Sequence, residues 1–307
     1  MPACLAHLCF AQKLESPLSE AFRLGTQGPD PFFFYGMIPW KKKKDAEKIE
    51  ALAQRIHHTD FASEYAAMIA FAQKEGDPEA KSLYREYLLG LLAHYSLDRT
   101  CHPYIFYRSG FDENGELTGH FSFAHKEFEA LLDLSLSEEL SFSRNPVKAM
   151  KIDEGAAKRI SFLWAQSGYP ELSEETFFLA YEDYLGIQSF LQSRTGWKRP
   201  LWKVFGKESA MVGFTYPHSA KGSSSKDVLN QKRSLWRDPC TGERKSQTFF
   251  QLMEEAERHY RRGQALLSAS ASPEKLTQEL AAWEGGIDHD GAPFGRKKEF
   301  LDPDSPF

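Results

Sequence analysis

The sequence predicts an all-α fold. Apolar residues recur at spacings of three and four in one segment after another, whereas the strict alternation typical of strands is scarce. Clusters of Gly, Pro, Asn and Asp separate these segments, as at 25–31 and 112–119. With 307 residues, the chain is long enough to bury a large core without disulfides. We therefore expect one helical domain over residues 1–285, followed by a turn-rich and poorly ordered tail over 286–307.

Start and stop signals set the expected helix boundaries. Asp77 and Pro78 form a good N-cap and first-turn pair, and Ser173 and Ser272 are similar start signals. Pro103 is expected to end the helix that Pro78 begins, because a proline interrupts helical hydrogen bonding. The predicted helices cover 62–74, 78–100, 121–136, 155–167, 173–194, 246–268 and 273–285.

Composition narrows the class of protein. The 38 Lys and Arg residues against 43 Asp and Glu residues give a formal net charge of -5, so no global basic field would attract nucleic acid. The four cysteines form no C-x-x-C pair and are expected to be reduced thiols. The N-terminal segment lacks the basic start of a signal peptide, and no apolar run approaches the roughly 18 residues of a membrane span. We expect a cytoplasmic protein.

Two pairs of potential metal ligands have helical spacing. His94 precedes Asp98 by four residues, and His125 precedes Glu129 by four. Because a helix advances about 100° per residue, the members of each pair share a face and can bind one cation. His102 follows Asp98 at the same spacing. Two helices with this pattern suggest metal sites inside a helical bundle, and an ordinary side-chain pair is the alternative reading of either one.

Further nitrogen and oxygen donors lie in the same half of the chain. They are His7, the loop residue Asp30, and one of the neighbours His57 and His58. Imidazole and carboxylate donors without thiolates favour zinc or a similar ion. The remaining histidine of this half, His120, has no acid at helical spacing behind it and is expected to be a surface or core residue.

The order of these motifs is similar to that of a known protein family. The motifs are His7, "GPDPFFFYG" with Asp30, "RIHH" with His57, "HYSLDRTCHPY" with His94, Asp98 and His102, and "HKEFE" with His125 and Glu129. The ordered set resembles the zinc-dependent phospholipase C family, in particular its intracellular bacterial members. The full set is far more specific than any single pair. The resemblance covers residues 1 to about 135, and a fainter similarity reaches about residue 256.

The resemblance implies a helical fold with a cleft for three zinc ions, shared with single-strand-specific nucleases. It implies that Asp30 is both a ligand and the general base, and that Asp98 bridges two of the ions. By motif, one zinc would be held by Asp30, His57, His94 and Asp98, the next by Asp98 and His7, and the third by His102, His125 and Glu129.

Two features depart from the secreted members of that family. Their processed N-terminal amine is a ligand, whereas here Met1 is followed by Pro2, whose amine could serve after methionine removal. Asp98 and His102 are also closer together in the sequence than their counterparts in the secreted enzymes.

The resemblance further implies hydrolysis of a phosphoester or phosphodiester, with a phospholipid headgroup as the precedent. Phe33, Tyr35 and Tyr104 could line a substrate pocket by stacking or cation-π contacts, and packing in the core is the alternative role for each. His218 lies beside Lys221 in a loop that could contact a phosphate, although an ordinary surface loop is the favoured reading.

Two other functions fit part of the pattern. The first is a catalytically silent helical protein that zinc merely stabilises; a carboxylate on a loop, Asp30, argues against such a closed structural site. The second is a single-strand nuclease on the same fold. The negative net charge and the lack of interleaved basic and aromatic segments argue against it.

Overall fold

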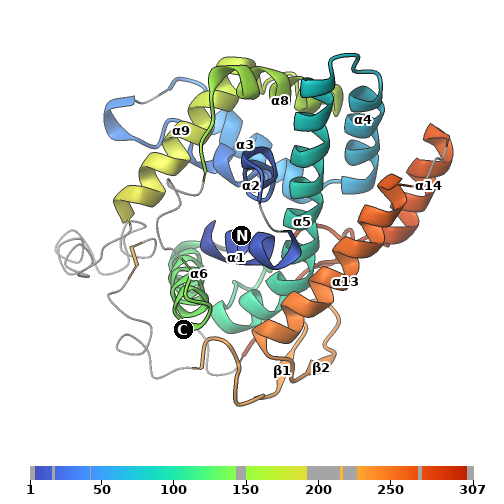
Figure 1. Ribbon diagram of the computed structural model, residues 1–307. Helices are drawn as coiled ribbons and strands as arrows, with labels where there is room; N and C mark the ends of the chain where they lie inside the picture. Colours follow the sequence, from blue (N-terminus) through green and yellow to red (C-terminus); the bar gives the residue numbers. More distant parts are fainter. Residues whose placement is uncertain are drawn as a thin grey trace.

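The computed structural model describes residues 4–15, 18–41, 43–142, 150–191, 215–216, 227–268 and 272–302. Within these ranges the protein is almost entirely helical, so the prediction of an all-α fold is confirmed (Figure 1). The described strands form one short antiparallel pair, β1 (Trp236–Arg237) with β2 (Arg244–Lys245). None of the helices in these ranges combines the length and the apolar character that crossing a bilayer requires.

The helices follow the predicted segments closely from residue 61 onward. They are α4 (Phe61–Gln73), α5 (Pro78–Ser109), α6 (Gly119–Glu139), α8 (Glu154–Gln166), α9 (Glu174–Leu191), α13 (Phe249–Ser268) and α14 (Pro273–Glu284). As predicted, Asp77 and Ser272 are N-caps, whose side chains accept hydrogen bonds from the amides of Glu79 and Lys275.

Several earlier elements had no counterpart among the predicted helices. They are α1 (Cys4–Leu14), α2 (Glu20–Gly25), the 3-10 helices η1 (Asp30–Phe34) and η2 (Pro39–Lys41), and α3 (Ala46–His57). Nearly all of α1 is buried, so its sequence shows no apolar face against a polar one. The short elements are set by tertiary contacts rather than by a repeating pattern.

Helix α5 is the centre of the structure. It packs against α2, α13, α6 and α1, and Figure 1 shows α1 lying in front between α5 and α6. Gly25 of α2 meets Gly90 of α5 so closely that a Cβ on Gly25 would lie 2.2 Å from the Tyr87 carbonyl oxygen. This glycine contact lets the two backbones approach, and it fixes the start of the turn that leads to Asp30.

The expectation that Pro103 ends its helix is wrong. Helix α5 continues through Pro103 to Ser109, and the amide of Gly110 donates to the Phe106 carbonyl at its end. Proline has no N–H for the carbonyl of Arg99, which is four residues earlier. Gly291 packs directly onto that carbonyl and onto the Pro103 ring, so a tertiary contact covers the interruption.

The C-terminal segment also differs from expectation. Residues 286–302, which we call the C-terminal strap, are turn-rich as predicted but pack against the body of the protein, with His289 fully buried. The amides of Glu299 and Phe300 donate to the Pro239 carbonyl, and the amide of Asp302 donates to that of Tyr107. Predictions that concern Pro2, residues 192–194, His218 and Lys221 lie outside the described residues.

Candidate metal centre

Every predicted ligand is buried where five elements meet. His7 comes from α1, Asp30 begins η1, and His57 is the last residue of α3. Helix α5 supplies His94, Asp98 and His102, and α6 supplies His125 and Glu129. All eight residues are at most 6 % exposed. Residues that are far apart in the sequence are therefore brought together in the interior.

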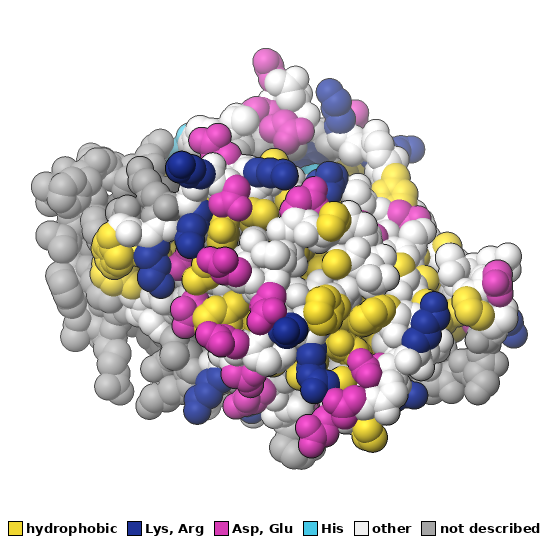
Figure 2. Space-filling model, turned by 90° about the horizontal axis from the view of Figure 1, so that it is seen from above, with side chains coloured by type: hydrophobic (Ala, Val, Ile, Leu, Met, Phe, Trp, Pro, Cys, Tyr) yellow, Lys and Arg dark blue, Asp and Glu magenta, His cyan; other side chains and the backbone are white. Residues whose placement is uncertain are grey.

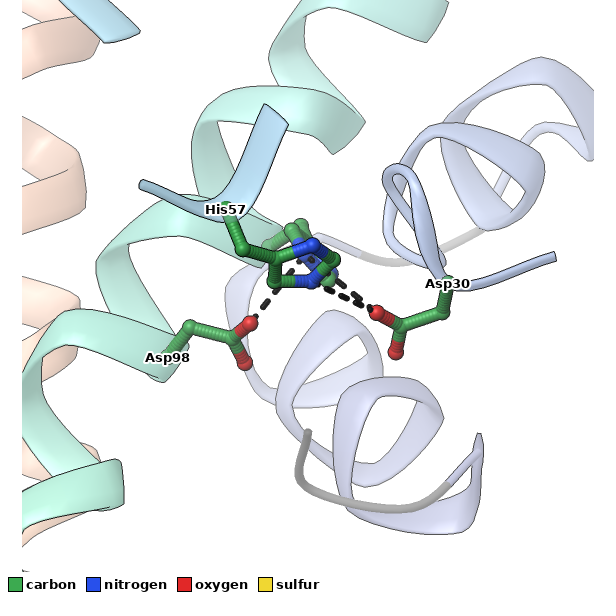
Figure 3. A group of neighbouring side chains, drawn as sticks. Asp30, His57 and Asp98 are labelled. Carbon is green, nitrogen blue, oxygen red and sulfur yellow. Dashed lines mark hydrogen bonds and ion pairs between the residues drawn. The ribbon is translucent and has the colours of Figure 1, made fainter. Parts of the chain in front are cut away.

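The first group consists of Asp30, His57, His94 and Asp98, with one potential ligand atom of each within 4.8 Å of the others. Asp30 Oδ1 lies 3.2 Å from His57 Nε2 and 3.9 Å from His94 Nε2. Asp98 Oδ2 lies 3.2 Å from His94 Nε2. Figure 3 shows Asp30, His57 and Asp98 turned toward one another from three separate segments. Two imidazoles and two carboxylates facing one point are a donor set that suits zinc.

His7 extends this group on the other side of Asp98. Its Nε2 lies 3.3 Å from Asp98 Oδ1 and 3.8 Å from Asp30 Oδ2. The His7 and His94 rings stack with their centroids 4.5 Å apart. The two oxygens of Asp98 thus face different imidazoles, which is the arrangement that a bridging carboxylate needs.

The second group consists of His102, His125 and Glu129. His125 Nε2 lies 3.3 Å from Glu129 Oε1 across one helical turn, and the His102 and His125 rings are 6.3 Å apart. Because α5 does not break at Pro103, His102 stays on the helix face that also carries His94 and Asp98. One helix therefore supplies ligand candidates to both groups.

Four of the histidines are oriented in the same way. Nδ1 of His57 is 2.8 Å from the Ala53 carbonyl oxygen, and Nδ1 of His94 is 3.2 Å from that of Thr26. Nδ1 of His102 is 2.7 Å from the His289 carbonyl oxygen, and Nδ1 of His125 is 3.1 Å from Ser109 Oγ. Such acceptors fix the tautomer and leave Nε2 to bind a metal.

The sequence offers Asp60, Glu86, Glu127 and backbone carbonyls as possible acceptors of this kind. In the structure, three backbone carbonyls and one hydroxyl are the acceptors. Asp60 instead caps α4 through the amide of Ser63, and Glu86 accepts hydrogen bonds from Ser19 and Arg85.

Several of the converging atoms have no hydrogen-bond partner among the described residues. They are both ring nitrogens of His7, Nε2 of His94, Nε2 of His102 and both carboxylate oxygens of Asp98. Leaving a buried polar atom without a partner costs about 1–3 kcal/mol. A cluster of such atoms in one place is suited to binding a ligand, and divalent cations fit this set of donors.

The protonation states also suit metal binding. Burial lowers the pKa of His102 to about 4 and lowers that of His125, so both rings are neutral at pH 7. Burial acts to raise the pKa of Asp98, but His94, His102 and His7 outweigh it and hold that pKa well below its usual value. Neutral imidazoles and ionised carboxylates are the forms that bind metal ions.

A cavity of about 390 Å³ borders both groups. Its wall includes His57 of the first group, His125 and Glu129 of the second, and the side chains of Phe33, Lys126 and Lys298. The Phe33 ring lies 5.2 Å from the His57 ring. A small molecule in this cavity would reach both groups, which a closed structural metal site does not allow.

The structure places the other two proposed pocket residues elsewhere. Tyr104 is fully buried, donates a hydrogen bond to the Val228 carbonyl and packs on Trp236, so its predicted contact with substrate is wrong. Tyr35 is also buried and donates to Asp45, outside the cavity wall. Both side chains pack in the core, which was the alternative role given for them.

Two further histidines clarify the site. His58, the alternative to His57, has a half-exposed side chain and faces Asp288 at 3.3 Å, so the structure brings His57 and not His58 into the first group. His289, which the sequence reasoning missed, packs its ring against those of His57 and His94. It contributes to the site through its backbone, and no residue spacing signals such a role.

Comparisons of the chain with protein-family models, curated proteins and solved structures find no match.

Proposed function

We propose that the protein is a zinc-dependent hydrolase of phosphoesters or phosphodiesters, similar to the zinc-dependent phospholipase C family in its fold and in a cleft for up to three zinc ions. The observation that carries the proposal is the convergence of unpartnered imidazole and carboxylate atoms beside a cavity. The sequence resemblance supports the assignment to this reaction class.

The residues divide into three sets of ligands in this proposal. Asp30, His57, His94 and Asp98 would hold one ion, His102, His125 and Glu129 would hold another, and His7 with Asp98 would hold the third. Ions bound there would neutralise charge on the phosphoryl oxygens and lower the pKa of a water molecule toward neutrality.

Asp30 takes the proton of the attacking water in this reaction. The water oxygen bonds to phosphorus, the bond from phosphorus to the leaving oxygen breaks, and that oxygen takes a proton from solvent. The rigid setting of Asp30 between Pro29 and Pro31 holds its carboxylate in place at the start of η1. His57 Nε2 lies 3.2 Å from Asp30 Oδ1, close enough for the two atoms to share one ion.

The character of the surface argues against a nucleic-acid substrate. On the face seen in Figure 2, Lys and Arg side chains are interspersed with Asp and Glu side chains and form no continuous basic tract. Binding that follows a phosphate backbone needs a positive groove. We therefore propose a small phosphoester or a lipid headgroup as the substrate, reaching the ions through the cavity beside Phe33.

A matched pair of variants on α6 tests the function. Zinc-loaded wild type, His125→Gln and His120→Gln would be assayed with bis(p-nitrophenyl) phosphate, phosphatidylcholine vesicles and single-stranded DNA. His120 is exposed and lies outside the cavity wall, so its variant should retain activity. The activity of His125→Gln should fall by more than about 100-fold, because a metal ligand is removed.

Each of the other outcomes has a distinct meaning. A wild-type protein that binds zinc but cleaves none of the three substrates would support the catalytically silent alternative. Cleavage of DNA alone would identify a nuclease. Equal activity of the two variants would contradict the assignment of His125 to the metal centre.

A further inference from the structure

The C-terminal strap folds into a compact loop at its start. Ile287 pairs with Pro293 in an antiparallel bridge, and the amide of Asp288 donates to the Ala292 carbonyl. The amide of Gly291 donates back to the Asp288 carbonyl and closes the turn. Residues 289–291 form the tip of this loop, and the tip points at the metal centre.

His289 at the tip contacts a ligand of each group through its backbone. Its amide donates to the His57 carbonyl at 3.2 Å, and its carbonyl accepts the hydrogen bond of His102 Nδ1 at 2.7 Å. The second contact decides which nitrogen of His102 is available. With Nδ1 bonded to the strap, the buried and unpartnered Nε2 is the atom left to bind a metal.

Gly291 docks the loop onto the interruption in α5. Its φ of +72° favours glycine, and a Cβ there would lie 2.5 Å from the Arg99 carbonyl oxygen and 2.6 Å from Pro103 Cγ. Pro103 directly follows His102. The strap therefore contacts α5 at the residue next to the ligand whose ring it orients.

A buried ion pair supports the same arrangement. Lys298 Nζ lies 2.9 Å from Asp290 Oδ2, and both side chains are 13 % exposed. Asp290 Oδ1 is 3.8 Å from His102 Nδ1. Lys298 also lies over the Phe106 ring at 4.1 Å, and Phe106 packs on His125. The pair links the strap to both histidines of the second group.

We propose that the C-terminal strap is a positioning element of the second metal group, and that the His289 carbonyl sets the ring of His102 for zinc binding. This proposal rests on the proposed metal binding. The strap acts on the second group through Nδ1 of His102, whereas Ala53 and Thr26 orient the histidines of the first group. Losing the docked strap should therefore weaken the second group more than the first.

Two glycines of the strap provide a matched test. Gly291→Ala introduces the clash with α5, whereas Gly295→Ala has a similar φ of +74° and no heavy atom within 4 Å of its Cβ. Protein stripped of metal with a chelator would be titrated with Zn²⁺ by calorimetry, and Co²⁺ absorption would report coordination. We expect Gly291→Ala to lose about 10- to 100-fold of its zinc affinity at the second group and less at the first, with Gly295→Ala matching wild type.

A second pair covers the case in which Gly291→Ala does not fold, as judged by circular dichroism. Lys298→Met keeps a long apolar side chain over Phe106 but leaves Asp290 without its cation, and Lys297→Met changes the exposed neighbour. We expect about a 10-fold loss of zinc affinity at the same group for Lys298→Met and no change for Lys297→Met.

The outcomes separate this proposal from the proposed function. The strap proposal alone would be overturned if the wild type binds zinc and Gly291→Ala has the same zinc affinity. If Gly291→Ala is unfolded, unchanged zinc affinity in Lys298→Met would have the same meaning. Equal weakening of all groups would also overturn it, because general destabilisation would then explain the loss. Wild type that binds no zinc would overturn both proposals.

Discussion

At the scale of single residues, the candidate metal centre depends on where each imidazole ring is held. The rings of His57, His94, His102 and His125 are fixed at Nδ1 by acceptors that come from local backbone, from a turn, from the strap and from a serine. Each Nε2 is then directed inward without a conformational search on binding. This preorganisation lowers the entropic cost of holding a cation.

Gly28 provides a direct test of ring placement. Its φ is +51°, and a Cβ there would lie 2.3 Å from Cδ2 of His94. Gly28→Ala should therefore push the His94 ring, destabilise the fold by about 1–3 kcal/mol and weaken zinc binding by about 10- to 100-fold. Urea denaturation and zinc titration measure the two effects.

Gly76→Ala is the matched control for this substitution. No heavy atom lies within 4 Å of a Cβ at Gly76. Its stability should stay the same or rise by up to about 1 kcal/mol, with zinc affinity unchanged. Equal zinc affinity in the two variants would contradict the placement of His94 in the metal centre.

A buried carboxyl away from the metal centre predicts a pH effect. Burial raises the pKa of Glu64 to about 7, although Tyr169 and Thr59 donate hydrogen bonds to it. The folded state holds the proton of the Glu64 carboxyl more tightly than the unfolded state does. The contribution of Glu64 to stability is therefore full below about pH 4.5 and is lost as the pH rises through about 7.

Glu64→Gln removes this titration and keeps the hydrogen-bond acceptor. Relative to the variant, the wild type should lose up to about 3 kcal/mol of unfolding free energy between pH 4.5 and pH 8. Urea midpoints with chelator in both samples measure the difference without a contribution from metal release. A difference that is independent of pH would show that the pKa of Glu64 is the same in the folded and unfolded states.

At the scale of elements, α6 connects the second group to helix α1. Asp133, one turn after Glu129, accepts hydrogen bonds from the amides of Leu5 and Ala6 at its two carboxylate oxygens, and Tyr216 donates to Oδ2 at 2.6 Å. These amides belong to the first turn of α1, where helical N–H groups need external acceptors. Asp133 thereby sets the position of α1 and of His7.

Asp133→Asn should break this link. An asparagine presents one NH₂ group, which would face a backbone N–H donor at either position. We expect a loss of about 1.5–3 kcal/mol in unfolding free energy and weaker binding of the zinc ion assigned to His7. Zinc stoichiometry and urea denaturation measure both.

Asp153→Ala serves as the comparison for Asp133→Asn. Asp153 caps α8, where its side chain accepts from the amide of Ala156 at 2.8 Å. Its loss should cost about 1 kcal/mol and leave the zinc stoichiometry at the wild-type value. If Asp133→Asn also kept full stoichiometry, the link from α6 to His7 would be disproved.

The elements also show what the sequence could predict. Amphipathic helices such as α4, α8 and α14 were found because their apolar spacing records one buried face. Four of the ligand candidates were found because His94 with Asp98 and His125 with Glu129 have helical spacing, whereas His7, Asp30 and His57 lie outside any such pair. The continuation of α5 through Pro103 was missed, because the contact that compensates for it comes from Gly291, far along the chain.

The strap was missed for a related reason. Turn residues predict a segment without helices or strands, but they do not reveal whether that segment packs on the protein. His289 acts through its amide and carbonyl groups, which every non-proline residue possesses, so its side chain gives no signal. Tyr104 was a pocket candidate because an aromatic ring can stack on a ligand, yet helix geometry turns it toward Trp236.

At the scale of the whole molecule, the metal centre joins elements from both ends of the described chain. The ligand candidates come from α1, η1, α3, α5 and α6, and the strap contacts a residue of each group. Ions held there would crosslink these elements. Bound zinc should stabilise the protein by about 2.7 kcal/mol per site when its free concentration is 100 times the Kd. Removal of metal should therefore lower the melting temperature.

Metal content is the measurement that tests the central claim most directly. Wild type and Asp98→Asn, purified without an affinity tag, would be analysed by plasma mass spectrometry and by thermal unfolding with and without chelator. We predict two to three zinc ions per wild-type chain, at least one fewer in the variant, and a lower melting temperature of the wild type after chelation. Less than one metal ion per wild-type chain, with a melting temperature that chelation leaves unchanged, would contradict the account.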